Sequence, residues 1–371
     1  MIYLDNAATT QCLDGVVDVM NNYLKHDYFN ASSVYAPAVK VRRDVENARN
    51  ELLDMVFASN HKLLFVSCAT EANNTIFESA TLRSGDKIIV SAGEHPSVFE
   101  CAKQFQNNGV EVCVVDLLPS GEIDEEDFAR KMDRRVKLVS VMMVSNETEA
   151  VNNIKRICKI AKKVNPRVLV ATDGVQAFGK IDVCVDDLGV DFFVMSAHKI
   201  HGPKGIGALV YRKDIHISPL LWGGGQENGL RSGTENVAGI MGFFEAAKLS
   251  MKNQKSNFEK VQKIRDEFID EFQNSGVKFS VNGNGSPFIL SLSFDGIRGE
   301  VLLHALEEHE ILVSTGSACS SKHSDNRILS AMGKSQAEVL GNVRISFNAH
   351  DAYDVKNIVK IFASTIEKLK G

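Results

Sequence analysis

The sequence predicts an α/β fold, in which a large domain with a mostly parallel sheet covered by helices precedes a smaller α/β domain. Two observations carry this prediction. Short apolar runs alternate with longer amphipathic stretches from about Lys62 to Tyr211, and a helical stretch followed by a second, shorter group of strands and helices comes after Asn236. At 371 residues the chain is long enough to build both cores.

The strands of the large domain are predicted from short apolar runs. They are Leu63–Ser67, Lys87–Val90, Val110–Val115, Leu138–Val144, Val168–Thr172, Phe192–Met195 and Ala208–Tyr211. Helical patterns between them include Glu71–Leu82, Pro96–Asn108 and Ile154–Val164. Because alternating strands and helices give parallel strands, we expect ligand-binding groups at the carboxyl ends of the strands.

The C-terminal part begins with a stretch of few helix breakers, about Val237 to Phe272, which predicts one long helix bridging two domains. Strand and helix patterns then recur. The strands are Phe288–Phe294 and Val343–Phe347, and the helices are Gly299–His309 and Val355–Leu369. We predict a large domain over residues 15–257 and a small domain formed by residues 1–14 and 258–371.

Composition excludes several classes of protein. The net charge of −5 gives no basic field for nucleic acid. No apolar segment is long enough to span a bilayer, and the first residues lack the pattern of a signal peptide, so we expect a cytoplasmic protein without a membrane partner. The seven cysteines are odd in number and form no CxxC pair, which argues against disulfides and a metal site. Most are expected to be buried, whereas Cys319 lies in the polar, loop-like stretch Ser314–Ser321.

The most informative motif runs from Ser196 to Gly205, directly after a predicted strand. Lys199 can form an imine with the aldehyde of pyridoxal 5'-phosphate (PLP), while Ser196 and His198 reach its phosphate. The alternative for Lys199 is a solvated loop charge. Asp173, also at a strand end, can pair with the pyridine nitrogen of PLP, and Gln176 can bind its phenolic oxygen. A helix cap is the alternative for Asp173.

Two further segments could bind this cofactor. Ala69 and Thr70 begin a helix whose backbone N–H groups suit a phosphate, although a capping box would explain the same residues. His95 follows another strand and could stack on the ring and move protons, although a lone loop histidine is often without function.

A third pair of residues suits a substrate carboxylate. Arg344 lies on an alternating strand and is either an exposed charge or a bidentate clamp, which Asn146 could assist. The glycine-rich run Trp222–Thr234 allows close approach of a ligand or a neighbouring subunit, with a flexible linker as the alternative.

Taken together, these motifs resemble the NifS/IscS-type cysteine desulfurases of the class V aminotransferase group, which are fold-type I PLP transferases. The resemblance extends from Tyr3 through Ser346. Its most specific parts are Ser196–Gly205, Arg231–Asn236 and Gly316–Cys319.

The resemblance implies a role for each candidate residue. Lys199 would be the Schiff-base lysine, His95 the acid/base stacked on the ring, and Cys319 the nucleophile. Asn146 and Arg344 would hold the carboxylate of L-cysteine. The cofactor-binding residues would be Ala69, Thr70, His95, Asn146, Asp173, Gln176, Ser196, His198 and Lys199, with Thr234 from the second subunit of a homodimer.

The implied reaction removes sulfur from L-cysteine, giving L-alanine and a persulfide on Cys319. The acceptor would be an iron–sulfur scaffold protein of the IscU/NifU type or a tRNA-thiolation enzyme, and a transient iron–sulfur ligand role for Cys319 stays open. Lys322 and His323 could lower the pKa of the thiol. The alternatives are a selenocysteine lyase or an aminotransferase of the same fold, or a degenerate homologue acting as a binding protein.

Several residues depart from the family pattern. Cys68 and Glu149 each stand where the family usually has glycine, Ser145 where it has asparagine, and Gly174 where it has alanine. A glutamate at 149 would strain the Asn146 loop if that position needs a positive φ. None of these changes removes a residue of the implied mechanism, so an active enzyme is predicted.

Overall fold

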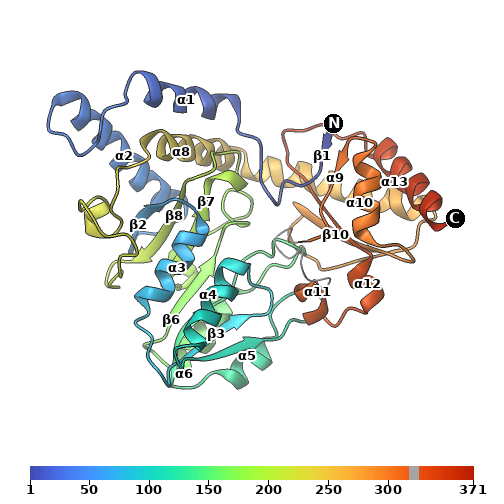
Figure 1. Ribbon diagram of the computed structural model, residues 1–371, viewed down its shortest axis with the longest axis horizontal. Coiled ribbons are helices and arrows are strands. Elements are labelled where there is room, and N and C mark those ends of the chain that lie inside the picture. Colours follow the sequence, from blue (N-terminus) through green and yellow to red (C-terminus); the bar gives the residue numbers. More distant parts are fainter. Residues whose placement is uncertain (317–325) are drawn as a thin grey trace.

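The computed structural model describes residues 1–316 and 326–371, and a seven-stranded sheet forms its centre (Figure 1). The strand order is β2-β8-β7-β6-β5-β3-β4, and every strand except β8 runs in the same direction. The strands are β2 (His61–Val66), β3 (Lys87–Ser91), β4 (Glu111–Val115), β5 (Val136–Ser140), β6 (Leu169–Asp173), β7 (Phe192–Ser196) and β8 (Gly207–Arg212).

Helices cover both faces of this sheet, so nearly all residues of its central strands β6 and β7 are buried. One core packs against the sheet from α1 (Asp14–Lys25), α2 (Ala36–Met55), α5 (Glu125–Lys131), α6 (Ile154–Val164), α7 (Val185–Leu188) and α8 (Val237–Lys252). The other face is covered by α3 (Ala69–Ser79) and α4 (Pro96–Gln106). In β7, Phe193 and Met195 point into the first core and Phe192 and Val194 into the second, because successive side chains of a strand alternate.

A second, smaller sheet lies beside the first. It is antiparallel, with the order β12-β10-β9, and consists of β9 (Phe279–Val281), β10 (Ile289–Phe294) and β12 (Asn342–Ser346). Its core includes side chains of α9 (Gln254–Asn274), α10 (Gly299–Glu307) and α13 (Val355–Lys370). The short helices α11 (Arg327–Ala331) and α12 (Gln336–Leu340) lie between α10 and β12, and β1 (Ile2–Tyr3) pairs with β11 (Ile311–Leu312).

The predicted fold class is confirmed, and most predicted elements lie within a few residues of the observed ones. The predicted single helix over Val237–Phe272 is wrong, because the chain breaks at Asn253 between α8 and α9. The short amide side chain of Asn253 donates to the carbonyl of Leu249 and competes with the backbone pattern. The predicted strand Leu138–Val144 ends at Ser140. The division into domains at residues 14/15 and 257/258 stays a prediction.

The cysteines differ from expectation in their burial. The six within the described residues are free thiols, but only Cys158 is buried, and the others are half-buried. Within the same residues, no helix is both long and apolar enough to cross a membrane.

A buried ion pair holds the glycine-rich segment against the edge of the large sheet. The carboxylate of Glu227, in the 3-10 turn Glu227–Gly229, accepts Arg49 Nη1 at 2.7 Å and Nη2 at 2.8 Å. It also accepts the backbone N–H of Phe65 in β2 at 3.1 Å. This bidentate pair therefore fixes the start of the segment that leads to Thr234.

We predict that Arg49→Met lowers the free energy of unfolding by about 3–5 kcal/mol, because it leaves the Glu227 carboxylate buried without a cation. Denaturant unfolding measures this loss. Lys155→Met, which removes an exposed ion pair with Asp187, is the matched control and should cost below about 1 kcal/mol. Equal losses in the two variants would contradict the structural role of the buried pair.

Candidate active site

The candidate residues converge where the parallel strands end. His95 follows β3, Asn146 follows β5, Asp173 ends β6, and Ser196 ends β7, with Lys199 in the 3-10 turn after it. Because neighbouring parallel strands end at one edge of a sheet, this topology brings side chains far apart in sequence to one place.

Lys199 is held by the N-terminal segment of the chain. Its Nζ donates to the carbonyls of Ala7 and Ala8, at 2.6 Å each. Gln176 Nε2 donates to the same Ala7 carbonyl at 3.0 Å. Lys199 and Gln176 therefore meet on one backbone oxygen, whose importance the sequence analysis missed. The only signal was the run of small and polar residues from Asp5 to Thr10.

Asp173 and His95 are joined through two residues that the sequence analysis did not select. Asn73 Nδ2 donates to Asp173 Oδ2 at 3.3 Å and to Ser97 Oγ at 2.9 Å. Ser97 Oγ lies 2.8 Å from His95 Nδ1. Asn73, on α3, thereby links the buried Asp173 through Ser97 to His95, the residue that precedes α4.

The proton of the neutral His95 ring can be placed from its contacts. The backbone N–H of Ser97 donates to His95 Nδ1 at 3.1 Å, so Nδ1 is an acceptor and the ring carries its proton on Nε2. Burial lowers the pKa of His95 and Lys199 adds to this shift, whereas the Asp173 carboxylate opposes it. His95 is therefore a neutral base that also caps α4.

Ser196 and His198 have the properties of a phosphate site. Ser196 Oγ is buried and has no hydrogen-bond partner among the described residues, so it is available to a ligand. His198 Nδ1 lies 3.2 Å from Thr9 Oγ1. Burial, and to a smaller extent repulsion from Lys199, lowers the pKa of His198 to about 4. A neutral His198 can donate one N–H to an anion without itself being charged.

Ala69 and Thr70 begin α3, and Thr70 is exposed. The residue that precedes them, Cys68, makes no side-chain cap, so the capping box considered above is absent. Thr234 is exposed as well, and neither threonine hydroxyl contacts the other candidates within residues 1–316 and 326–371. Cys319, the predicted nucleophile, lies outside the described residues, as do Lys322 and His323.

Arg344 and Asn146 form a cluster with unused hydrogen-bonding groups. Arg344 is 3% exposed, which excludes the exposed-charge alternative. Its Nη2 donates to Asp5 Oδ1 and its Nη1 to the Asn146 carbonyl, both at 2.7 Å. Arg344 Nε and Asn146 Oδ1 are buried and have no partner among the described residues. The open Nε–H of Arg344 can donate to a carboxylate ligand, whereas Asn146 Oδ1 can accept from a donor group of the ligand.

Two departures from the family pattern are accommodated by this chain's own residues. Glu149 does not have a positive φ, so the expected strain is absent. Its carboxylate accepts Arg265 Nη2 at 2.6 Å and Nε at 2.9 Å, which ties the Asn146 loop to α9. Gly174 is needed here, because a Cβ would lie 2.1 Å from the ring of Phe193.

Glu94, the residue before His95, is a buried acid next to the site. Its Oε1 accepts Ser91 Oγ at 2.5 Å and the Met142 N–H at 2.8 Å. Burial raises the pKa of Glu94 to about 8, so its carboxyl group is largely protonated at neutral pH. Arg327 donates to the carbonyls of Glu94 and Ala92 and so fastens the start of α11 to the His95 loop.

Comparisons with known proteins agree with this arrangement. The family model for class V aminotransferases matches residues 2–358. A protein of Dictyoglomus turgidum named cysteine desulfurase IscS is 34% identical, with 100% of this chain and 95% of the relative covered. A putative cysteine desulfurase IscS 1 of Bacillus subtilis is also 34% identical, with 99% of each chain covered.

Solved structures show the same likeness. A NifS-like protein superposes with a TM-score of 0.92 at 31% identity, covering 99% of this chain and 100% of the other. The structure described as SspA in complex with cysteine has a TM-score of 0.82 at 27% identity, covering 95% of this chain and 100% of the other.

We predict that Glu94→Gln flattens the pH dependence of stability of the protein without cofactor. The pKa of Glu94 in the fold, about 8, lies above its ordinary value of 4.5, so its contribution to stability is complete below pH 4.5 and is lost as the pH rises toward 8. The loss is on the order of 3 kcal/mol. Denaturant unfolding between pH 5 and 8 should show a smaller decline for the variant.

The control for this prediction is Glu100→Gln, which changes an exposed carboxylate on α4. It should leave the pH profile unchanged. A Glu94→Gln profile as steep as that of the unaltered protein would show that Glu94 is ionised throughout the range.

Proposed function

Since the chain belongs to the class V aminotransferase family and is an enzyme of the cysteine desulfurase type, we propose that it releases sulfur from L-cysteine with PLP and Cys319. The observation that carries this proposal is that the candidate residues form one group of contacts. Lys199 and Gln176 share the Ala7 carbonyl, Asp173 is linked to His95, and Arg344 binds the backbone of Asn146. The products would be L-alanine and a persulfide on Cys319.

The residues present fit PLP. Lys199 supplies the amine, Asp173 a buried carboxylate for the pyridine nitrogen, and Gln176 a hydrogen bond for the phenolic oxygen. The orphan hydroxyl of Ser196 supports a phosphate at the end of β7, and Ala69, Thr70 and His198 would be its further ligands. When bound, PLP would withdraw electrons from the carbon atoms of the substrate.

The protein's own groups would perform the remaining tasks. Arg344 and Asn146 would orient the substrate through its carboxylate, and His95 and Lys199 would accept and return protons. The thiolate of Cys319 would attack the sulfur of L-cysteine, so that a sulfur–sulfur bond forms and the carbon–sulfur bond breaks. The carbon would keep the bonding electron pair and take up a proton, and L-alanine would leave.

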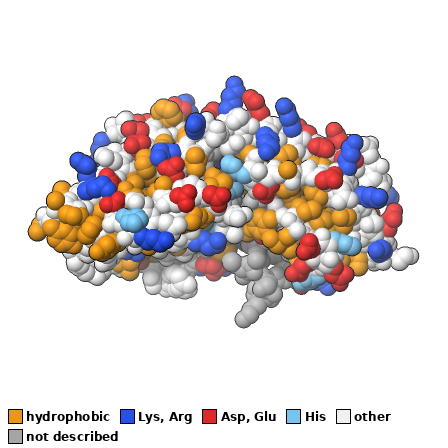
Figure 2. Space-filling model, turned by 90° about the horizontal axis from the view of Figure 1, so that it is seen from above, with side chains coloured by type: hydrophobic (Ala, Val, Ile, Leu, Met, Phe, Trp, Pro, Cys, Tyr) orange, Lys and Arg blue, Asp and Glu red, His pale blue; other side chains and the backbone are white. Residues whose placement is uncertain are grey.

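Exposed apolar side chains support a homodimer. Val34 is 90% exposed and Trp222 83% exposed, and Tyr28 and Tyr35 are exposed as well. Figure 2 shows hydrophobic side chains gathered at the end of the molecule that carries the turn between α1 and α2. Thr234, exposed at the end of the glycine-rich segment, would then complete the phosphate site of the partner subunit.

The persulfide sulfur would pass to an acceptor protein in the cytoplasm. Several relatives are named cysteine desulfurase IscS, which favours an iron–sulfur scaffold of the IscU/NifU type as the acceptor. A tRNA-thiolation enzyme is the second candidate. An aminotransferase or selenocysteine lyase is the competing activity. Dependence on the Cys319 thiol separates an aminotransferase from the proposed enzyme.

We predict that Cys319→Ala lowers sulfide release from L-cysteine more than about 100-fold, because the nucleophile is lost. The visible absorbance of bound PLP should be unchanged. Sulfide release without added thiol is the measurement, and Cys184→Ala, a half-buried cysteine at the start of α7, is the control. Undiminished sulfide release by Cys319→Ala would overturn the proposed mechanism.

We predict that Thr234 acts across the dimer. A hybrid of one Lys199→Ala subunit and one Thr234→Val subunit would contain one intact site, because Lys199 of the second chain would meet Thr234 of the first. Its PLP affinity at that site should match the unaltered protein, whereas each homodimer would bind PLP more weakly. Hybrids no better than Thr234→Val homodimers would contradict the exchange.

A further inference from the structure

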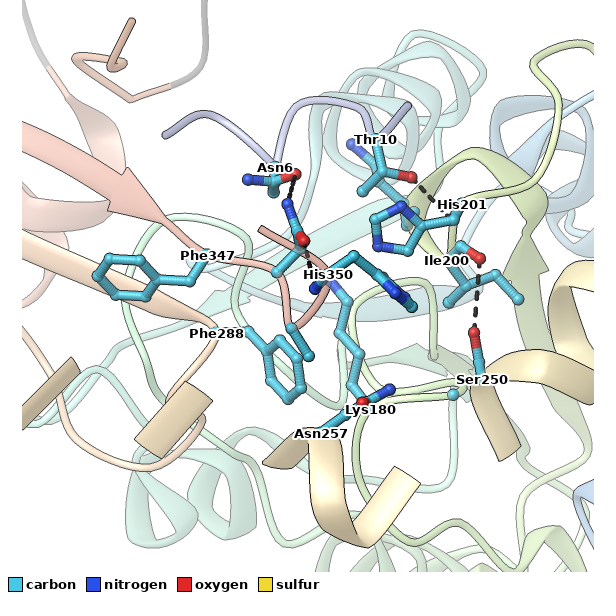
Figure 3. A pocket seen from close by; sticks show the side chains of 14 residues that line it. Asn6, Thr10, Lys180, Ile200, His201, Ser250, Asn257, Phe288, Phe347 and His350 are labelled. Carbon is cyan, nitrogen blue, oxygen red and sulfur yellow. Dashed lines mark hydrogen bonds between the residues drawn. The ribbon is translucent and has the colours of Figure 1, made fainter. Parts of the chain in front are cut away.

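Lys180 is a buried lysine to which the mechanism assigns no role. It lines a cavity of about 30 Å³ together with Lys199, His201 and His350, at the boundary of the two sheets (Figure 3). Lys180 is 8% exposed. Among the described residues no carboxylate forms an ion pair with it.

The hydrogen bond of Lys180 goes to a residue of the cofactor site. Nζ donates to Gln176 Oε1 at 2.7 Å, four residues back along the chain in the turn that follows β6. Nζ also lies 5.6 Å from the centre of the Phe288 ring, which offers the ammonium group a favourable face. Both contacts hold the Nζ end of the side chain, which therefore lies between Gln176 and Phe288, the residue before β10 of the smaller sheet.

Lys180 donates to the oxygen of the Gln176 amide, and because the ammonium form of a lysine can only donate, this contact favours that orientation of the amide. The amide N–H₂ then faces the Ala7 carbonyl and Lys199. The Ala7 carbonyl, which can only accept, favours the same orientation, and Lys180 adds a second contact against a turned-over amide that would present its oxygen where the site needs a donor.

Keeping an amine at this position is unfavourable for folding. Burial, with repulsion from Lys199 and Arg344, lowers the pKa of Lys180 to about 7. An apolar side chain would avoid that penalty, so the lysine has a reason other than stability.

We propose that Lys180 is a positioning residue that fixes Gln176 as the hydrogen-bond donor to the phenolic oxygen of PLP. This inference rests on the proposed function, and it deepens it by adding a residue that acts on the cofactor through another side chain. Lys180 would act on the cofactor through its hydrogen bond to Gln176.

The test is PLP binding by full-length Lys180→Met, followed through the visible absorbance that appears on covalent binding. The PLP dissociation constant should rise about 3- to 10-fold, as expected for one lost hydrogen bond. The pH midpoint of the absorbance should move upward, because a donor and a nearby cation both disfavour an added proton on the chromophore. Lys180→Arg, which keeps a donor, should restore both values.

A double variant separates positioning from general damage. In a Gln176→Leu background, Lys180→Met should cause no further loss of PLP affinity, because the residue through which it acts is absent. Lys87→Met, at a buried lysine that begins β3, is the control and should leave the absorbance and its pH midpoint unchanged.

The outcomes are distinct. If the unaltered protein forms no visible band with PLP, the proposed function fails. If the band forms, two results would contradict the positioning role. One is that Lys180→Met has the same PLP affinity and pH midpoint as the unaltered protein, and the other is that it lowers PLP affinity by its full effect in the Gln176→Leu background as well. Thermal unfolding checks each variant, and Lys180→Leu is judged by the same criteria if the methionine variant does not fold.

Discussion

The carbonyl oxygen of Ala7 is the point on which the site depends, because Lys199 and Gln176 both donate to it. The segment that carries this carbonyl starts in β1, which pairs with β11 beside the smaller sheet. It then crosses to the large sheet, where Thr10 donates to the carbonyl of His198. The N-terminal segment thereby joins the two sheets at Lys199. A shift of either sheet would move the acceptor shared by two functional side chains.

Charge in the site is unbalanced in a way that suits an anionic ligand. Lys199, Lys180 and Arg344 lie close enough for Lys199 and Arg344 to lower the pKa of Lys180. His95 and His198 are kept neutral by burial, which limits the repulsion. Asp5 balances part of this charge through its ion pair with Arg344, and the open donor groups Ser196 Oγ and Arg344 Nε suit an anionic ligand.

The departures from the family pattern illustrate compensation by distant residues. A glutamate at position 149 buries a carboxylate whose pKa burial raises to about 7, and Arg265 on α9 pairs with it. The ring of Phe193 occupies the space that a side chain at Gly174 would need. In each case a change in one loop is matched by a residue that is remote in sequence, and the Asn146 loop and the Asp173 turn remain in place.

Local patterns were enough to predict the fold class and most strands to within a few residues, because alternating apolar runs and turn residues are local properties of the chain. It also placed Lys199, Asp173, His95 and Arg344 among the candidates, since each stands at or on a strand with a recognisable chemical role. It failed at Asn253, where one side chain's hydrogen bond interrupts an otherwise helical pattern.

Only the tertiary structure decided which groups meet. The chain Asp173–Asn73–Ser97–His95, the Glu149–Arg265 pair and the shared Ala7 carbonyl each join segments far apart in sequence. Their geometry follows from strand order and packing, which no local pattern encodes. Lys180 illustrates this difference. The sequence shows that it lies four residues after Gln176. Its burial beside Phe288, without a carboxylate partner among the described residues, follows only from the packing of the two sheets.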